Sequence, residues 1–194
     1  MQPEAPPECN LDCAQALKAK KREICAVDGV SGIAERGTSM FRPMRRIKQQ
    51  LSQEECEQVL TSERRGVLSV HGEDGYPYGV PMDYLYEQGK IYFHGAKVGH
   101  KIDAIKADNR VSFTVFDQGV PVEGKVGPNV RSVIVFGRIS LLETTPETLE
   151  IARRLGEKYD PSSYVADELK RTAERIQLLE LAIDHMSGKR VNES

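Results

Sequence analysis

The sequence lacks the short motifs that mark several large enzyme classes. It contains no Gly-x-Gly-x-x-Gly dinucleotide loop, no phosphate loop ending in Gly-Lys-Ser/Thr, no Gly-x-Ser-x-Gly elbow and no His-Glu-x-x-His pair. Each pattern supplies the donors, nucleophile or metal ligands that its chemistry needs. Their absence leaves Rossmann oxidoreductases, P-loop NTPases, elbow-type serine hydrolases and zinc proteases without support.

Long apolar runs and a strong charge of one sign are missing as well. No stretch approaches the roughly 20 apolar residues that span a bilayer, and the N-terminus lacks the apolar core of about 7–15 residues that a secretory signal needs. The 27 Lys and Arg residues against 29 Asp and Glu give a net charge of −2, which argues against general nucleic-acid binding. We therefore expect a cytoplasmic protein without a membrane or nucleic-acid partner.

Cysteine is scarce, and its spacing does not favour a metal site. Three of the four cysteines lie within residues 1–39, and Cys56 stands alone in a predicted helix, so no paired zinc-ligand pattern repeats and we expect no metal. Residues 1–39 combine prolines, a basic run and glycines, and they need no core. We expect a flexible extension there, either a start-site artefact or a partner-binding arm, followed by one domain over 40–194.

The spacing of apolar residues and turns predicts a mainly β protein with flanking helices. Short turns join most of the strands, which favours a barrel of about six mostly antiparallel strands over a doubly wound sheet. The expected strands are 66–71, 77–86, 91–95, 110–116 and 131–142. The expected helices, which lie at the periphery, are 53–63 with a capping box from Ser52 and Glu55, 99–107, 146–158 and 162–185.

The predicted strand 77–86 has two different faces. One face carries alternating large side chains, namely Tyr76, Tyr78, Val80, Met82, Tyr84 and Tyr86. The other face includes Pro77 and Pro81, which have no N–H to donate, so the strand must be an edge strand or bulged. Backbone groups around Pro81–Tyr84 that escape ladder pairing could bond a planar polar heterocycle.

The stretch 91–105 runs from a strand through Gly95 and Gly99 into a helix. Glycine lets a backbone approach a ligand closely, and the first turn of a helix offers unpaired N–H groups and a positive dipole end. Lys97, His100 and Lys101 add side-chain donors. The pattern predicts an anion site, with phosphate as the expected guest; a basic surface loop is the alternative.

Taken together, these segments resemble the FMN-binding split barrels of the pyridoxamine 5'-phosphate oxidase superfamily, and more narrowly its nitroimidazole-resistance branch. The resemblance covers roughly 40–190. It implies a split barrel that forms a homodimer, with two flavin sites at the subunit interface and each site using both chains. The segments that carry it are Gly66–Val70, Gly75–Tyr84, Gly89–Ala96, Gly99–Lys101, Asn109–Phe113, Arg131–Arg138 and Ile183–Lys189.

The resemblance also implies roles for individual residues. Lys101 matches a phosphate-binding lysine, and His94 matches a histidine near the flavin ring, where it could position substrate or pass a proton as the catalytic residue. The alternative at His94 is an ordinary core histidine satisfied by one hydrogen bond, and the alternative at His100 is a polar surface residue. Ser132 and Val133 would reach the partner subunit's flavin. The implied cofactor-binding set is Pro81, Met82, Asp83, Tyr84, His94, Gly95, Ala96, His100, Lys101, Ser132 and Val133.

The implied function is an FMN-dependent oxidoreductase that takes electrons from a nicotinamide donor. Nitroaromatic (nitroimidazole-like) and other small electron-poor compounds are the candidate substrates. The authentic pyridoxamine 5'-phosphate oxidases carry basic residues where this chain has Val80–Tyr84, which argues against vitamin B6 synthesis. Two alternatives stay open: a non-catalytic flavin- or haem-binding carrier or sensor on the same barrel, and a deazaflavin-dependent enzyme.

Overall fold

The computed structural model describes residues 40–124 and 126–192. The chain separates into two units, Met1–Met40 and Phe41–Ser194, and the second contains all the helices and strands that the structure describes. The expected N-terminal extension and its three cysteines lie outside the described residues.

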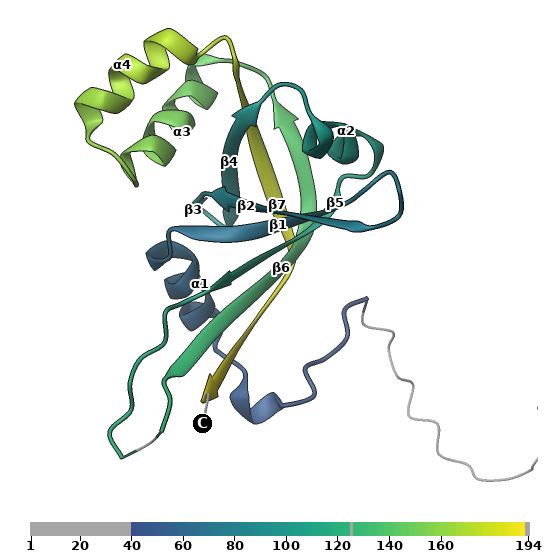
Figure 1. Cartoon of the computed structure of the whole chain (residues 1–194), viewed down its shortest axis with the longest axis vertical. Coiled ribbons are helices and arrows are strands. Elements are labelled where there is room, and N and C mark those ends of the chain that lie inside the picture. Colours follow the sequence, from purple (N-terminus) through teal and green to yellow (C-terminus); the bar gives the residue numbers. More distant parts are fainter. Residues whose placement is uncertain (1–39, 125, 193–194) are drawn as a thin grey trace, which may run out of the picture. The chain divides into compact units, whose positions relative to one another are not determined.

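Seven antiparallel strands form one curled sheet in the order β2-β1-β5-β6-β7-β4-β3 (Figure 1). The long strands β6 and β7 pair from Asn129 and Asn192 at one end to Leu142 and Leu178 at the other. The predicted class, mainly β with a split-barrel architecture, is confirmed. The strands are β1 Arg65–His71, β2 Pro77–Asp83, β3 Leu85–Glu87, β4 Lys90–Ala96, β5 Arg110–Phe116, β6 Asn129–Leu142 and β7 Ile176–Asn192.

The helices flank this sheet, and α3 and α4 form a hairpin at one end of it (Figure 1). They are α1 Gln53–Ser62, α2 His100–Ala107, α3 Pro146–Glu157 and α4 Ser162–Thr172, with a short 3₁₀ helix, η2, over Ile47–Gln49. The predicted capping box begins α1, because Ser52 Oγ accepts the Glu55 N–H at 3.2 Å and the Glu55 carboxylate accepts the Ser52 N–H at 2.8 Å. None of the described helices is long and apolar enough to cross a membrane.

The prediction of one helix over 162–185 is wrong beyond Thr172, because the chain continues as strand β7 from Ile176. The spacing of Ile176, Leu179 and Ile183 fits a helical period, but this segment is apolar on both faces. As a central strand with β6 on one side and β4 on the other, it buries Leu178, Leu179 and Leu181 and satisfies its backbone groups. Tertiary pairing therefore overrides the local pattern and adds β7 to the expected strands, and the expected strand 77–86 is divided into β2 and β3.

The edge position predicted for the proline-containing strand is confirmed. β2 is the terminal strand of the sheet, and its Pro77 and Pro81 stand opposite His71 and Val67 of β1. The large side chains turn inward: Tyr84 is fully buried, and its ring meets Phe113 edge-on at 4.9 Å between centroids. The exception is Tyr76, which precedes β2 and is 74% exposed.

Gly137 lies where the register of β6 against β7 shifts, between Phe136 and Gly137. A Cβ atom at this position would clash with the carbonyl group of Ala182 in β7. The two backbones approach closely because no side chain separates them. This irregularity lies in the longest ladder of the sheet, so it affects how the sheet coils.

We expect Gly137→Ala to lower the free energy of unfolding by about 1–3 kcal/mol, because the added methyl must push the β6 and β7 backbones apart. Chemical denaturation measures the change. Ser140→Ala, at an exposed position of the same strand, is the matched control and should change stability by less than about 0.5 kcal/mol. A Gly137→Ala protein as stable as the wild type would contradict the described register.

Candidate functional site

Two strands that are distant in the order of the sheet, β2 and β4, meet at the start of α2. Lys101 lies in the first turn of α2, and its Nζ is 3.5 Å from Sδ of Met82 on β2. The same Nζ would be 2.8 Å from a Cβ atom built on Gly95 of β4. The curl of the sheet thus brings together Met82, Gly95 and Lys101, which the sequence placed on separate segments.

The ammonium group of Lys101 has no carboxylate partner among residues 40–124 and 126–192. Its recorded hydrogen-bond contact is the Met82 thioether, a weak acceptor. Burial lowers the pKa of Lys101, and the nearby helix start is itself electropositive. A half-buried cation in such surroundings gains stability from an anion, so the geometry suits a phosphate group.

The backbone at the start of α2 adds donors to this position. Gly99 has a φ of 125° and no side chain caps the helix, and the first amides to bond back to its carbonyl are those of Ile102 and Asp103. The N–H groups of His100 and Lys101 precede these bonds, as expected for an anion-binding helix start. The His100 ring stacks on Tyr78 of β2, 4.2 Å between centroids.

His94 leaves β4 on the face opposite the buried Phe93 and lines a cavity against the α3–α4 hairpin. Desolvation lowers the pKa of His94, the carboxylate of Asp83 opposes this shift, and the charge of Lys101 adds to it. The net shift is downward, so the imidazole is neutral at about pH 7. A neutral ring can both donate and accept a hydrogen bond.

The corner between β2 and β3 is held by two residues that follow α3, Lys158 and Tyr159, here called the α3 clamp. The Tyr159 hydroxyl accepts the Tyr84 N–H at 2.8 Å and lies 2.7 Å from the Tyr84 carbonyl oxygen and 2.5 Å from that of Arg64. Lys158 Nζ donates to the Glu63 carbonyl at 2.7 Å. These contacts fix the backbone segment that was predicted to face a heterocycle.

Sequence reasoning missed the α3 clamp. Lys158 Nζ also lies 4.2 Å over the centre of the Tyr84 ring, so the clamp fixes both the backbone and the side chain of Tyr84. A Lys-Tyr pair after a helix has no motif of its own. Its role follows only from contacts between residues 75 positions apart in the chain.

Some of the remaining predicted residues lie beside Met82, Gly95 and Lys101, and the others lie in another part of the sheet. Pro81 and Asp83 flank Met82 on β2, and Ala96 ends β4 beside Gly95. Ser132 and Val133 lie on β6. Strands β1 and β5 lie between β6 and β2, and strand β7 lies between β6 and β4. The Val133 side chain is fully buried. A contact of Ser132 and Val133 with a second subunit's flavin stays a prediction.

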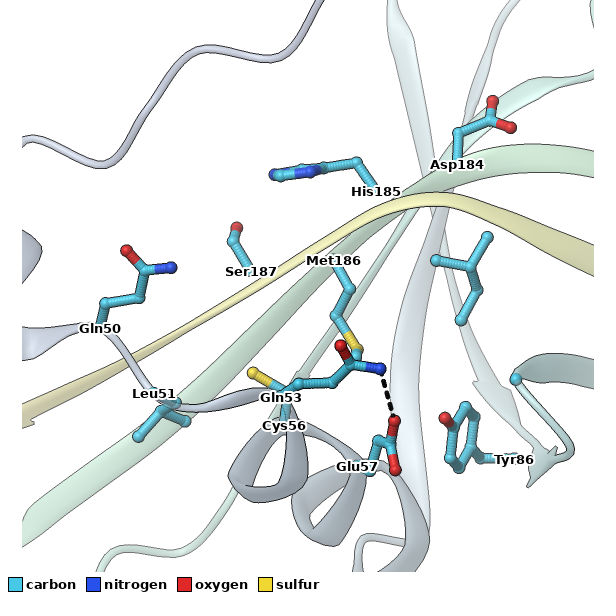
Figure 2. Close-up of a pocket in the computed structure, with 12 residues that line it drawn as sticks. Gln50, Leu51, Gln53, Cys56, Glu57, Tyr86, Asp184, His185, Met186 and Ser187 are labelled. Carbon is cyan, nitrogen blue, oxygen red and sulfur yellow. Dashed lines mark hydrogen bonds between the residues drawn. The ribbon is translucent and has the colours of Figure 1, made fainter. Parts of the chain in front are cut away.

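A separate pocket of about 530 Å³ lies between the start of α1 and β7 (Figure 2). It contains none of the predicted site residues. Met186 points into it, and Gln53 donates to Glu57 at 2.9 Å on its wall. Desolvation raises the pKa of the buried Cys56 to about 11, so this lining thiol stays protonated and is a poor nucleophile.

The fold and sequence are similar to known proteins. A family model described as pyridoxamine 5'-phosphate oxidase matches residues 52–190. A FAD-binding protein from Mesorhizobium loti is 28% identical, with a TM-score of 0.55 over 74% of this chain and 98% of that chain. A candidate 5-nitroimidazole antibiotic resistance protein from Bacteroides thetaiotaomicron shares the fold. It is 19% identical, with a TM-score of 0.59 over 73% of this chain and 86% of that chain. No curated protein matches the sequence.

The contribution of the α3 clamp to the stability of the fold should depend on pH. Desolvation lowers the pKa of Lys158 from 10.5 to about 8, and the Arg64 charge adds to the shift. Above about pH 8 the unfolded chain therefore holds a proton that the folded protein has lost, so this group's contribution to stability rises with pH until about pH 10. We expect wild type to gain about 1–2 kcal/mol relative to Lys158→Met over that interval.

Denaturant titrations at several pH values measure this difference. Lys106→Met, which removes an exposed lysine near the end of α2, is the matched control for the loss of a lysine. Parallel pH profiles for wild type and Lys158→Met would contradict the desolvated state of Lys158.

Proposed function

The chain belongs to the pyridoxamine 5'-phosphate oxidase family, and from that premise we propose that it is an FMN-dependent oxidoreductase acting on small electron-poor compounds. The observation that carries the proposal is the convergence of Met82, Gly95 and Lys101 at the start of α2. The residues present fit a flavin mononucleotide, since within the described chain they combine a cation without a carboxylate partner, first-turn helix amides and a glycine that leaves no side chain in the way.

We assign the phosphate end of FMN to Lys101 and the adjacent amides. An ammonium facing a phosphate dianion forms a strong charge-assisted hydrogen bond. A side chain at Gly95 would displace the Lys101 ammonium, because its Cβ would lie 2.8 Å from Nζ. His100, held against Tyr78, would lie beside the phosphate as a further donor.

We assign the flavin ring to the open edge of β2 at Pro81–Tyr84. No described strand pairs with this edge, so the outward backbone groups of Pro81–Asp83 are available to the polar edge of a heterocycle. The backbone N–H and C=O of Tyr84 are instead bonded to the α3 clamp, which keeps Tyr84 in place. When bound, the flavin supplies hydride and electron transfer, whereas the protein supplies orientation and electrostatics. His94 would meet the substrate as a neutral imidazole that positions it or transfers a proton.

The substrate class follows from charge and from similarity. Residues Val80–Tyr84 include the acidic Asp83 and no basic residue, which disfavours a vitamin B6 phosphate. The similarity to the candidate 5-nitroimidazole resistance protein of Bacteroides thetaiotaomicron supports nitroaromatic compounds as substrates. We propose a nicotinamide electron donor and a cytoplasmic location, as the sequence leads us to expect.

A second copy of this chain is the partner that the outer face of the sheet fits. Phe116 on β5 and Ile134 and Phe136 on β6 are 58%, 40% and 39% exposed and form an apolar face. Ser132 alternates with Ile134 and Phe136, so it belongs to the same face of β6. A homodimer through this face would carry Ser132, and the backbone of Val133, toward the partner subunit's flavin.

Replacing Lys101 tests the cofactor assignment. Lys101→Glu should weaken FMN binding by at least about 10–100-fold, because it removes a charge-assisted hydrogen bond and introduces repulsion. Flavin fluorescence titration of the apoprotein measures affinity. Lys106→Glu, in the last turn of the same helix, should bind FMN normally. Unchanged FMN affinity in Lys101→Glu would refute the phosphate assignment.

The purified wild-type protein distinguishes the alternatives. Flavin absorption together with nicotinamide-dependent reduction of a nitroaromatic compound over many turnovers supports the enzyme. Bound flavin without turnover favours a carrier, a Soret band favours a haem protein, and selective binding of a deazaflavin would replace FMN as the cofactor.

The dimer is tested by Ile134→Asp, which places a charge on the apolar face. We expect a mostly monomeric protein by sedimentation, with weakened flavin binding because the partner's contribution is lost. Tyr76→Asp, at an exposed position before β2, should remain dimeric. A dimeric Ile134→Asp protein would place the subunit interface elsewhere.

A further inference from the structure

The cavity beside His94 lies between β4, the α3–α4 hairpin and the beginning of β7. Its volume is about 130 Å³. His94, Asp160 and Tyr164 are exposed where they line it, so the cavity is partly open and can admit one small substituted ring. His94 lines it from β4, and Asp160, Tyr164 and Glu168 line it from the hairpin.

The walls of this cavity are held by close packing. A Cβ atom at Gly156 of α3 would lie 2.8 Å from Cγ1 of Val165 on α4, so the two helices touch at that glycine. Leu155, one residue earlier, is fully buried and packs with Leu178 of β7. The α3–α4 hairpin is therefore packed against the sheet and shapes one wall of the cavity.

The charged side chains that line the cavity are both acidic. The lining includes the carboxylates of Asp160 and Glu168 and no Lys or Arg among the described residues. Glu168 pairs with Arg171 at 2.7 Å, whereas no ion pair engages Asp160 in the described part of the chain. The imidazole of His94 is neutral, so it does not offset the acidic charge. The apolar side chains of Ala152, Val165 and Ile176 complete the walls.

We propose that this cavity is the substrate site and that it selects single-ring aromatic compounds that are neutral or cationic, while its carboxylates reject anionic analogues. This inference rests on the proposed function, which places the flavin ring near His94. His94 gives the bound ring a hydrogen-bonding partner, the apolar walls contact its faces, and Asp160 with Glu168 determines the charge that is accepted.

The opposite ends of the site then have opposite charge preferences. Lys101 and the helix start favour the phosphate of the cofactor, whereas Asp160 and Glu168 disfavour a second anion. A compound with its own phosphate or carboxylate is attracted to the first position and repelled from the second. This arrangement separates cofactor from substrate by charge.

Three nitro compounds of matched size test the proposal: 4-nitrobenzylamine, 4-nitrobenzyl alcohol and 4-nitrobenzoate, which are cationic, neutral and anionic. Both kcat/KM and the Kd for the oxidised, FMN-loaded protein are measured. We expect the amine and the alcohol to exceed the benzoate by at least about tenfold in both quantities. Added salt should narrow this gap, because the selection is electrostatic.

Variants show which residues carry the selection. The double variant Asp160→Asn with Glu168→Gln should bring the benzoate to within about threefold of the alcohol. Asp167→Asn removes one carboxylate from the same helix as Glu168 but lies outside the cavity, and it should leave the gap unchanged. Ala152→Val, which narrows the cavity, should weaken binding of all three compounds while FMN content stays normal.

The outcomes separate this inference from the proposed function. If the loaded protein binds the compounds in the expected order but reduces none, the substrate-site assignment stands and the nitroreductase proposal fails. If it reduces all three equally and the double variant behaves like wild type, the cavity assignment is overturned and the oxidoreductase proposal stands. Absence of binding by all three compounds also overturns the cavity assignment.

Discussion

The structure depends on the long antiparallel ladder between β6 and β7. This ladder connects β5, β1 and β2 on one side to β4 and β3 on the other, and its irregularity at Gly137 lies where a side chain would separate the two backbones. Because the sheet curls, strands that are distant in its order approach each other in space. Met82 of β2 and Gly95 of β4 both meet Lys101 for this reason.

The candidate site combines this curl with a backbone corner held from outside the sheet. β2 is an edge strand, which leaves backbone groups available but also leaves the strand weakly supported. Tyr159 supplies the missing support, since its hydroxyl bonds both backbone groups of Tyr84. The α3–α4 hairpin therefore does two things: it fixes the segment proposed to face the flavin ring, and it forms one wall of the cavity beside His94.

Desolvation gives the titratable groups of this region their distinct properties. Lys101, Lys158 and His94 all have pKa values lowered chiefly by desolvation. Lys158 is compensated by carbonyl oxygens and the Tyr84 ring, whereas the hydrogen-bond contact of Lys101 within the described residues is the Met82 thioether. This contrast explains why we assign a structural role to Lys158 and a ligand-binding role to Lys101, although both are partly buried lysines.

The sequence by itself determined the features that depend on neighbours in the chain: the Ser52–Glu55 capping box, the edge strand that its prolines require, and the glycine-rich entry into α2. The resemblance supplied the fold and the proposed flavin chemistry. Only the tertiary structure decided that residues 176–192 form a central strand, since an apolar run fits helix and strand equally until its neighbours are known. It also decided that Tyr159 supports Tyr84 and that Asp160 shares a cavity with His94. No local pattern encodes contacts between residues so far apart, because chain folding alone brings them together.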